Sequence, residues 1–397
     1  EKMRKFIAQR AQYAVIIHEM GHFIALRHNF VSSSDAFNYR SQYWQLRTKN
    51  GTVKTVCDDL SNDGEACIGP RYFDPITENE QKNLMWMFMQ SSVMDYAGEV
   101  TQDLIGLGAY DFAAARMFYG DTVAVFADNT PKTGFGVLTA KGRGVLEKVD
   151  NFGGLLGWDP QIGNTAGTDS SSIHYTEMQE KFGMISNCVE VDPNAFKPAS
   201  WDEKKHGVFH PVLDGLIVSV DGKYTRCKQQ PVDFVQWNSL RMPNAAAKET
   251  TAFYRGGPSI DTQGRTRVPY GFATDSWADL GNSAVYRHDN GADIYELFDF
   301  FITQQEVGHI FDDYRRGRKS FSIRGAAGRT LSRFNEKLRD SAKGLGLLVN
   351  IYKAFGTEIG VNQTSMVDYA LTNFFPTNAL ASGIAFDHFA RMMARPE

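Results

Sequence analysis

Four residues near the start of the chain, His18, Glu19, His22 and His28, constrain the fold more than any other feature of the sequence. Side chains four residues apart lie on one face of an α-helix, so a helix through His18 and His22 directs both imidazoles towards one point. His28 lies six residues after His22, and on an unbroken helix it would be about 120° away from that face. The three imidazoles can meet only if the helix ends soon after His22 and the chain turns back.

These residue types in this pattern have the chemistry of a catalytic zinc site. Imidazole nitrogens bind Zn²⁺ at about 2.0–2.1 Å, and H-E-x-x-H followed by a third histidine is typical of zinc hydrolases. We therefore predict that His18, His22 and His28 bind the metal. Glu19 lies one residue round the helix from His18, where it can act as a general base without ligating the metal. The third histidine argues against a chance match on a solvated helix face.

Three segments of the chain resemble the metzincins, a clan of zinc endopeptidases with a third histidine and a methionine turn under the metal. Residues 18–30 are similar to the H-E-x-x-H-x-x-G-L-R-H-N-F signature of bacterial secreted metalloproteases, and residues 26–30, Leu-Arg-His-Asn-Phe, are intact. Residues 92–96, Ser-Val-Met-Asp-Tyr, resemble the methionine turn. Residues 109–120 resemble the helix ending in Tyr-Gly that closes many metzincin catalytic domains. The resemblance covers about residues 1–120.

The methionine turn implies two supporting residues. We expect Met94 to form an apolar floor beneath the histidines without bonding to the metal, with an ordinary core methionine as the alternative. Tyr96 is the candidate phenol that helps to stabilise an oxyanion. In metzincins with a tyrosine at this position, it ligates zinc at rest and swings out to bind the transition state. The alternative is that Tyr96 only packs beside the turn.

Two departures from the family pattern bear on the fold. Ala25 stands where the family has a turn glycine, at a position where positive φ costs alanine about 1 kcal/mol. We expect the turn to form nevertheless, because the residues that follow it are retained. Metzincins also place a twisted sheet before the zinc helix, whereas 17 helix-like residues precede His18 here. The sequence therefore predicts a fragment, a processed chain, or one half of an assembly with a separate N-terminal chain or propeptide.

The resemblance implies a zinc-dependent endopeptidase that acts on a protein or peptide. Zinc lowers the pKa of a bound water from about 15.7 towards about 7, and Glu19 takes its proton and returns it to the leaving amine. A zinc-binding but inactive assembly or binding module is the alternative from a different class. Ala25 and the missing sheet favour that alternative, and the intact Glu19 argues against it. Hydrolysis of a non-peptide amide or ester is a third possibility.

Charge, hydropathy and cysteines limit the partners and the compartment. The net charge is −4 and the pI about 6.2, so nothing indicates a nucleic-acid partner. No apolar run reaches about 18 residues, so we predict no membrane span. Cys57 and Cys67 bracket a short polar loop suited to a disulfide, and Cys188 and Cys227 are the candidates for a second. With the protease class, these pairs favour a secreted, cell-surface or periplasmic bacterial protein.

The polar loop between Cys57 and Cys67 is also a candidate site for Ca²⁺, although it lacks the alternation of an EF-hand loop. Asp275 and Asp289 are further candidates for a role near the cleft or in Ca²⁺ binding, without support from spacing. His206 and His210 are spaced H-x-x-x-H, but Gly207 and Pro211 disfavour a helix there. We therefore do not predict a second zinc site.

The chain as a whole is predicted to be α+β and helix-rich, in three regions. Residues 1–120 form the zinc catalytic region, lacking its usual N-terminal sheet and carrying an insertion at 31–76. Residues 121–255 form a mixed region that begins with loops, and residues 216–227 read as a β-hairpin with a type I′ turn. Residues 256–397 are mainly helical, with amphipathic stretches near 293–316, 327–356 and 364–394.

Two local predictions concern the catalytic region. Thr77 and Glu80 form a capping-box signature for a helix through about Met89. The aromatic residues Tyr39, Tyr43 and Trp44 of the insertion either cover part of the cleft or form a small satellite core.

Overall fold

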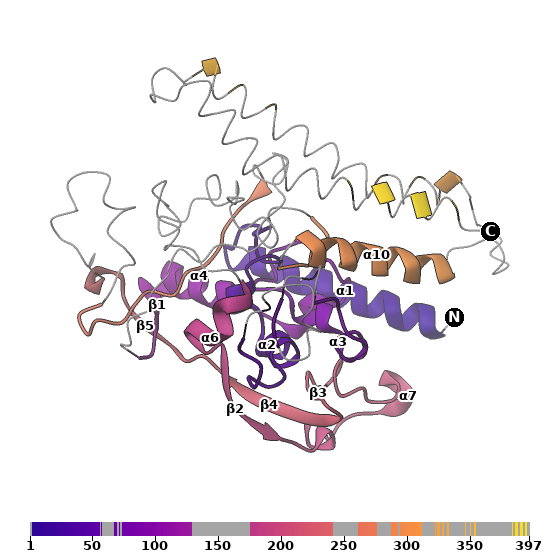
Figure 1. Cartoon of the computed structure of the whole chain (residues 1–397), viewed down its shortest axis with the longest axis horizontal. Coiled ribbons are helices and arrows are strands. Elements are labelled where there is room, and N and C mark those ends of the chain that lie inside the picture. Colours follow the sequence, from indigo (N-terminus) through magenta and orange to yellow (C-terminus); the bar gives the residue numbers. More distant parts are fainter. Residues whose placement is uncertain are drawn as a thin grey trace.

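The computed structural model describes residues 2–55, 57, 67–69, 71, 74–128, 175–240, 261–275, 287–292 and 294–311, with isolated positions beyond residue 321. Its described part mixes helices with two small antiparallel sheets, compatible with the predicted α+β class (Figure 1). The loop at 58–66, residues 129–174 and most of the predicted C-terminal helices lie outside the described residues. None of the helices in the described part combines the length and apolar character needed to span a membrane.

The first helix, α1 (Lys2–Phe23), ends where the sequence predicts. Ala25 has a φ of 67°, the left-handed conformation expected of the family's glycine position. The amide of Leu26 donates to the carbonyl of Gly21 at 3.1 Å, which closes the last turn. The chain therefore reverses directly after His22, and α1 is followed by η1 (Ala36–Asn38) and α2 (Ser41–Arg47).

The capping box is confirmed, but the predicted extent of its helix is wrong. Thr77 and Glu80 exchange the two hydrogen bonds of the box at the start of α3 (Glu78–Lys82). Leu84 then adopts a left-handed φ of 50°, and a separate 3₁₀ helix, η2 (Met85–Phe88), follows. The apolar run after Lys82 is buried as this second element rather than as one amphipathic helix.

Two further elements complete the described part of the first region. The 3₁₀ helix η3 (Gln102–Ile105) leads into α4 (Ala109–Gly120), which ends at Asp121 with a left-handed φ of 49°. A strand, β1 (Thr122–Phe126), follows at once, so the prediction that this stretch begins as loop is wrong. Its run of Val, Ala and Phe suits a buried strand, and four of its five residues are buried.

The two sheets lie in the region after α4. β1 pairs antiparallel with β5 (Val232–Gln236), and the order in the other sheet is β2-β4-β3, from Ile185–Glu190, Lys223–Gln229 and Val218–Val220. Asp221 and Gly222 both have positive φ, which confirms the predicted hairpin between β3 and β4. The remaining named elements are η5 (Tyr175–Glu177), α6 (Met178–Phe182), η6 (Pro193–Phe196), α7 (Glu203–His206), η7 (Trp237–Ser239) and α10 (Ile294–Phe311).

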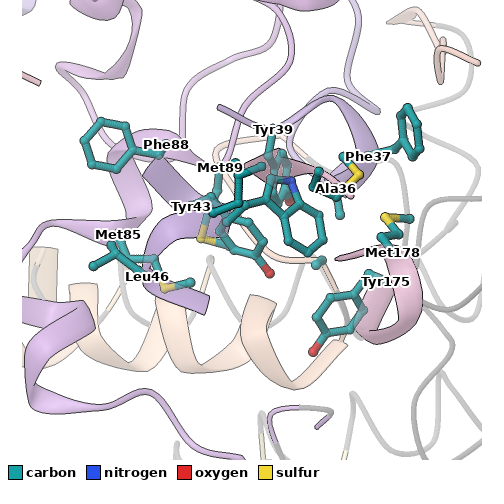
Figure 2. Packing of buried hydrophobic residues seen from close by; sticks show 14 of the residues in the cluster. Ala36, Phe37, Tyr39, Tyr43, Leu46, Met85, Phe88, Met89, Tyr175 and Met178 are labelled. Atoms are coloured by element: carbon teal, nitrogen blue, oxygen red, sulfur yellow. The ribbon is translucent and has the colours of Figure 1, made fainter. Parts of the chain in front are cut away.

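The aromatic insertion contributes to the main core rather than to a satellite core. Tyr39, Tyr43 and Trp44 are fully buried and pack with Met85, Phe88 and other side chains of one large cluster (Figure 2). The same cluster includes residues of β1, of the β2-β4-β3 sheet and of α10. Described residues from all three predicted regions thus share one hydrophobic core.

A buried ion-pair network joins α10 to this core. Arg71 donates to both Glu80 and Glu296, with nitrogen–oxygen distances of 2.9 Å, and all three side chains are buried. Glu296 also accepts from the amide of Ala292 at 2.7 Å. Because removing one partner of such a network leaves an uncompensated buried charge, it fixes how α10 docks.

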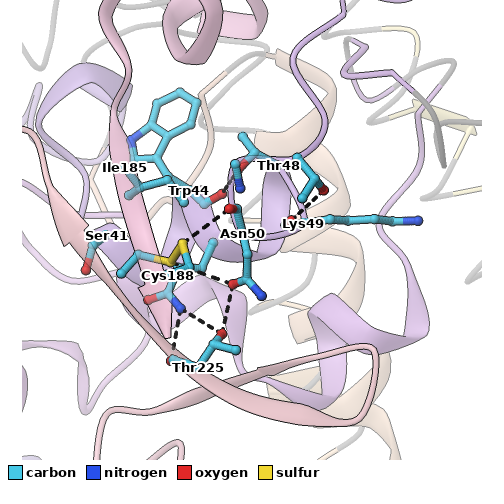
Figure 3. The surroundings of a disulfide bond; sticks show 12 residues. Ser41, Trp44, Thr48, Lys49, Asn50, Ile185, Cys188 and Thr225 are labelled. Carbon is cyan, nitrogen blue, oxygen red and sulfur yellow. Dashed lines mark hydrogen bonds between the residues drawn. A yellow bond between two sulfur atoms is a disulfide. The ribbon is translucent and has the colours of Figure 1, made fainter. Parts of the chain in front are cut away.

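Both predicted disulfides are present, Cys57–Cys67 and Cys188–Cys227. The second lies beside the loop after α2, where Cys188 contacts Asn50 (Figure 3). The Thr225 hydroxyl of β4 donates to the Asn50 side chain at 2.8 Å. The disulfide joins β2 to β4 within the sheet, and this hydrogen bond ties the sheet to the loop after α2.

Candidate metal centre

The structure brings the three predicted histidines together. His18 and His22 lie on one face of α1, and the turn at Ala25 carries His28 back to them. One nitrogen from each ring lies within 4.8 Å of those from the other two, and the Nε2 atoms of His22 and His28 are 3.0 Å apart. No other group of three potential ligands among the described residues comes as close.

Each histidine uses its Nδ1 atom for a second contact. The His18 Nδ1 lies 2.7 Å from the carbonyl oxygen of Val93, and the His22 Nδ1 lies 2.9 Å from that of Leu26. A carbonyl oxygen only accepts, so both Nδ1 atoms carry a proton, and in the neutral form of each ring the Nε2 atom is then free of one. In that form the rings can offer nitrogen lone pairs to a common point.

This donor set fits zinc. Three neutral imidazoles and an open position are a common catalytic zinc environment, and two ligands of a tetrahedral site stand about 3.3 Å apart at the usual bond lengths. Burial lowers the pKa of His18 below its usual value, despite the opposing hydrogen bond to Val93. The lower pKa favours the neutral form of His18, which is the form that binds a metal.

Asp275 supplies the second contact of His28. Both carboxylate oxygens lie 2.9 Å from the His28 Nδ1, and the Asp275 side chain is 49% exposed. Burial is the largest single effect and opposes ionisation of this carboxyl, but the interaction with His28 and the hydrogen bonds from the Asp275 amide and the Thr274 hydroxyl together lower the pKa of Asp275. A carboxylate behind a ligating histidine orients the ring and raises its basicity. Sequence reasoning assigned Asp275 only to a role near the cleft or in Ca²⁺ binding, because 247 positions separate it from His28.

Met94 lies against the helix that carries His18 and His22. Its side chain is fully buried, and a Cβ added to Gly21 would stand 2.2 Å from the Met94 sulfur. Gly21 therefore allows the methionine to lie directly against the backbone of α1 between His18 and His22. The amide of Asn29 donates to the Met94 carbonyl at 2.8 Å, which joins the turn to the residues after His28.

The turn around Met94 is held by Asp111, a residue that the sequence reasoning missed. The Asp111 carboxylate accepts from the Ser92 hydroxyl at 2.5 Å and from the amides of Val93 and Gly108 at 2.9 and 2.8 Å. Burial raises the pKa of Asp111, although these donors oppose the shift. The sequence signal that could have indicated this role is the acidic residue at the third position of the helix, where a side chain can accept from amides at the helix start.

Tyr96 lies beside two of the three histidines. The centroid of its ring is 4.9 Å from that of His28, 5.7 Å from that of His18 and 5.0 Å from that of Phe30. Glu19 is exposed on α1, next to the buried His18, and its charge acts on the His18 imidazole. Among the described residues, the ligand cluster consists of His18, His22 and His28 with Tyr96 beside two of them, and neither His206 nor His210 belongs to it.

Residues 1–64 match a family model described as Met-zincin. The matched range includes Glu19 and the three histidines but ends before Met94 and Tyr96. The match supports a metzincin-like family, for which zinc is the implied metal. No curated protein and no solved structure matches the chain.

Proposed function

We propose that this chain is a zinc-dependent endopeptidase, with His18, His22 and His28 as the metal ligands. The observation that carries the proposal is the convergence of three imidazole nitrogens within 4.8 Å of one another, next to an exposed Glu19. The match of residues 1–64 to a Met-zincin family supports the same reaction class. The closer relationship to bacterial secreted metalloproteases with an H-E-x-x-H-x-x-G-L-R-H-N-F signature is part of this proposal.

The protein side chains divide the work of peptide hydrolysis. Zinc, when bound, supplies a Lewis acid that polarises the peptide carbonyl and acidifies water. Glu19 takes the proton from the attacking water and returns it to the leaving amine. The Tyr96 hydroxyl donates a hydrogen bond to the oxyanion that develops on the carbonyl. Asp275 holds the His28 ring in the orientation that exposes its Nε2, and Met94 supports the histidines from below.

The same proposal places the protein in a secreted, cell-surface or periplasmic compartment, with a protein or peptide as substrate. The two disulfides are compatible with an oxidising environment. Calcium is not part of this proposal. The polar loop between Cys57 and Cys67, which suggested this ion, lies outside the described residues.

Metal dependence tests the proposal. The purified chain is stripped with a chelator, reloaded with Zn²⁺, and assayed for zinc content and for cleavage of a denatured protein substrate. We expect about one zinc per chain and cleavage only in the reloaded protein. His22→Ala should lose both, whereas His206→Ala, in the exposed helix α7, should keep both. Stoichiometric zinc without cleavage would support an inactive binding module, and equal zinc content in His22→Ala would contradict the ligand assignment.

A further inference from the structure

Two consecutive residues far along the chain lie against the rings that flank His28. The guanidinium carbon of Arg287 is 5.2 Å from the centroid of the Phe30 ring. The His288 ring is stacked on Tyr96, with centroids 5.4 Å apart and an angle of 20° between the ring planes. Phe30 and Tyr96 in turn contact His28 at 5.2 and 4.9 Å. The segment therefore reaches the metal ligands through two aromatic side chains.

His288 contacts Tyr96 in a different way from the other neighbouring rings. His18, His28 and Phe30 meet the tyrosine at interplanar angles of 47°, 68° and 69°. Among the described ring contacts of Tyr96, the one with His288 is the stacked contact. A stacked ring lies over one face of the tyrosine and limits how far it can swing out of its own plane towards that side.

The backbone holds His288 in this place. Its amide donates to the carbonyl of Tyr96 at 3.0 Å, and the next residue, Asp289, forms an isolated parallel bridge with Ala97. The Ser33 hydroxyl donates to the buried Asp289 carboxylate at 3.2 Å. A Cβ added to Gly98 would come within 2.8 Å of the Asp289 backbone, so this close approach requires glycine. The contact with Tyr96 is therefore anchored independently of the exposed imidazole.

His288 also has an unusual backbone conformation. Its φ is 58°, in the left-handed region that residues other than glycine seldom adopt. Such a conformation persists only where the surrounding structure determines it. Here the His288 amide donates to the Tyr96 carbonyl, and the next residue, Asp289, accepts from the Ser33 hydroxyl. Strain of this kind is frequent at functional sites.

We propose that His288 is a positioning residue that fixes the ring of Tyr96 beside the metal-binding histidines. The stacked imidazole keeps the tyrosine from swinging away from His18 and His28, so that its hydroxyl stays where an oxyanion would form. The catalytic consequence rests on the proposed peptidase function. The placement of the His288 ring against the Tyr96 ring does not rest on that function, and a separate experiment tests it.

The first test measures the position of Tyr96 in the zinc-free protein. The chain contains 16 tyrosines, so labelling with 3-fluorotyrosine gives a set of ¹⁹F resonances in which Tyr96 is assigned by its loss in Tyr96→Phe. His288→Asn removes the ring while keeping a residue that tolerates left-handed φ, and His288→Phe keeps a stacking ring. We expect the Asn variant to move the Tyr96 resonance downfield and the Phe variant to keep it upfield. An unmoved resonance in His288→Asn would overturn the proposal.

The second test is a double-mutant cycle on peptide cleavage by the zinc-loaded chain. His288→Asn should lower kcat/KM about threefold to tenfold, mainly through kcat, and His288→Phe should restore most of the loss. In the Tyr96→Phe background, His288→Asn should have no further effect, because the hydroxyl to be positioned is already absent. An equal loss in both backgrounds would overturn the positioning role.

The matched control is His206→Asn, which removes another exposed histidine that contacts an aromatic ring, Trp201, at 5.1 Å. It should leave both the Tyr96 resonance and kcat/KM unchanged. Absence of cleavage in the parent chain would defeat the proposed function while the ¹⁹F experiment still decides the placement of His288. The two failures are therefore distinguishable.

Discussion

Ala25 adopts an unfavourable backbone conformation that brings three histidines together. Its left-handed conformation costs an alanine about 1–2 kcal/mol, and the turn that it forms returns His28 to His18 and His22. The retained residues after the turn stabilise it through hydrogen bonds. The Asn29 side chain donates to the carbonyl of Gly271 at 3.1 Å and accepts from the amide of Ala273 at 3.1 Å.

Ala25→Gly should therefore stabilise the protein. Relief of the left-handed strain outweighs the greater flexibility of glycine in the unfolded chain, for a net gain of about 0.5–1 kcal/mol in the free energy of unfolding. Urea unfolding measures the change. The same substitution at the exposed helical residue Ala8 should instead destabilise by about 1 kcal/mol. A loss of stability in Ala25→Gly would show that the turn is not strained in this way.

Asp275 gives a second prediction at the residue scale. Asp275→Ala removes the partner of the His28 Nδ1 and should weaken zinc binding about 10- to 100-fold. The zinc affinity of Asp275→Asn should lie between those of the parent and Asp275→Ala. Competition with a fluorescent chelator gives the dissociation constants. Asp233→Ala is a matched control, because Asp233 is similarly exposed and pairs with Arg265 instead. Equal zinc affinities in the parent and Asp275→Ala would remove Asp275 from the centre.

At the scale of elements, the centre depends on how three pieces meet: α1, the turn around Met94 and the start of α4. Gly21 permits contact between the first two, and Asp111 joins the second to the third. A Cβ added to Gly108 would stand 2.0 Å from the Ser91 carbonyl oxygen, so α4 approaches the turn as closely as its backbone allows. The methionine turn is thus fixed from both sides.

Gly21→Ala tests this packing. Alanine favours the helix by about 1 kcal/mol, but its methyl group must displace Met94, and overpacking of this kind costs about 1–3 kcal/mol. We expect a net loss of stability together with weaker zinc binding. Met94→Ala should rescue part of the loss, so that the double variant is more stable than the sum of the single changes predicts. Strictly additive free energies of unfolding would contradict the contact.

Local patterns in the sequence predicted the features whose geometry is local. The zinc motif, the positive φ at Ala25, the Asp221-Gly222 hairpin and the capping box at Thr77 depend on residues a few positions apart. The helix through Met89 was wrong because burial of the apolar residues after Leu84 in the core outweighs helix periodicity.

The residues that complete the centre were beyond such reasoning. Asp275 and His288 reach the zinc motif and the methionine turn from segments more than 190 positions away, and nothing in their spacing indicates this. Asp111 was within the resemblance, but its role needs the three-dimensional approach of α4 to the turn. The division of the chain into regions at residues 120 and 255 stays a prediction. Residues from all three regions share one hydrophobic core, so the core does not mark these boundaries.

At the scale of the whole molecule, a buried carboxyl beside this assembly makes stability depend on pH. Burial raises the pKa of Asp103 to about 7, although a hydrogen bond from Gln90 at 2.8 Å opposes the shift. The folded protein therefore retains a proton that the unfolded chain loses near its ordinary pKa of 3.8. The contribution of Asp103 to stability is fully present below about pH 3.8, declines as the pH rises, and is lost above about pH 7.

Asp103→Asn mimics the protonated acid at every pH and should remove this decline. The free energy of unfolding of the variant relative to the parent should rise between about pH 4 and 7, by up to about 4 kcal/mol. Urea unfolding at several pH values follows the difference. Glu180→Gln makes the same charge change at an exposed position of α6 and should show no such rise. A difference independent of pH would contradict a proton held on Asp103.

The central claim is that the centre cleaves peptide bonds with Glu19 as the base. Its most direct test is mass-spectrometric analysis of a proteome-derived peptide library digested by the zinc-loaded chain and by Glu19→Ala. We predict cleavage with a defined preference around the scissile bond in the parent, and its loss in a variant that still binds zinc. Cleavage that persists in Glu19→Ala would contradict the assignment of the base, and an intact library with both proteins would contradict the peptidase function of this chain.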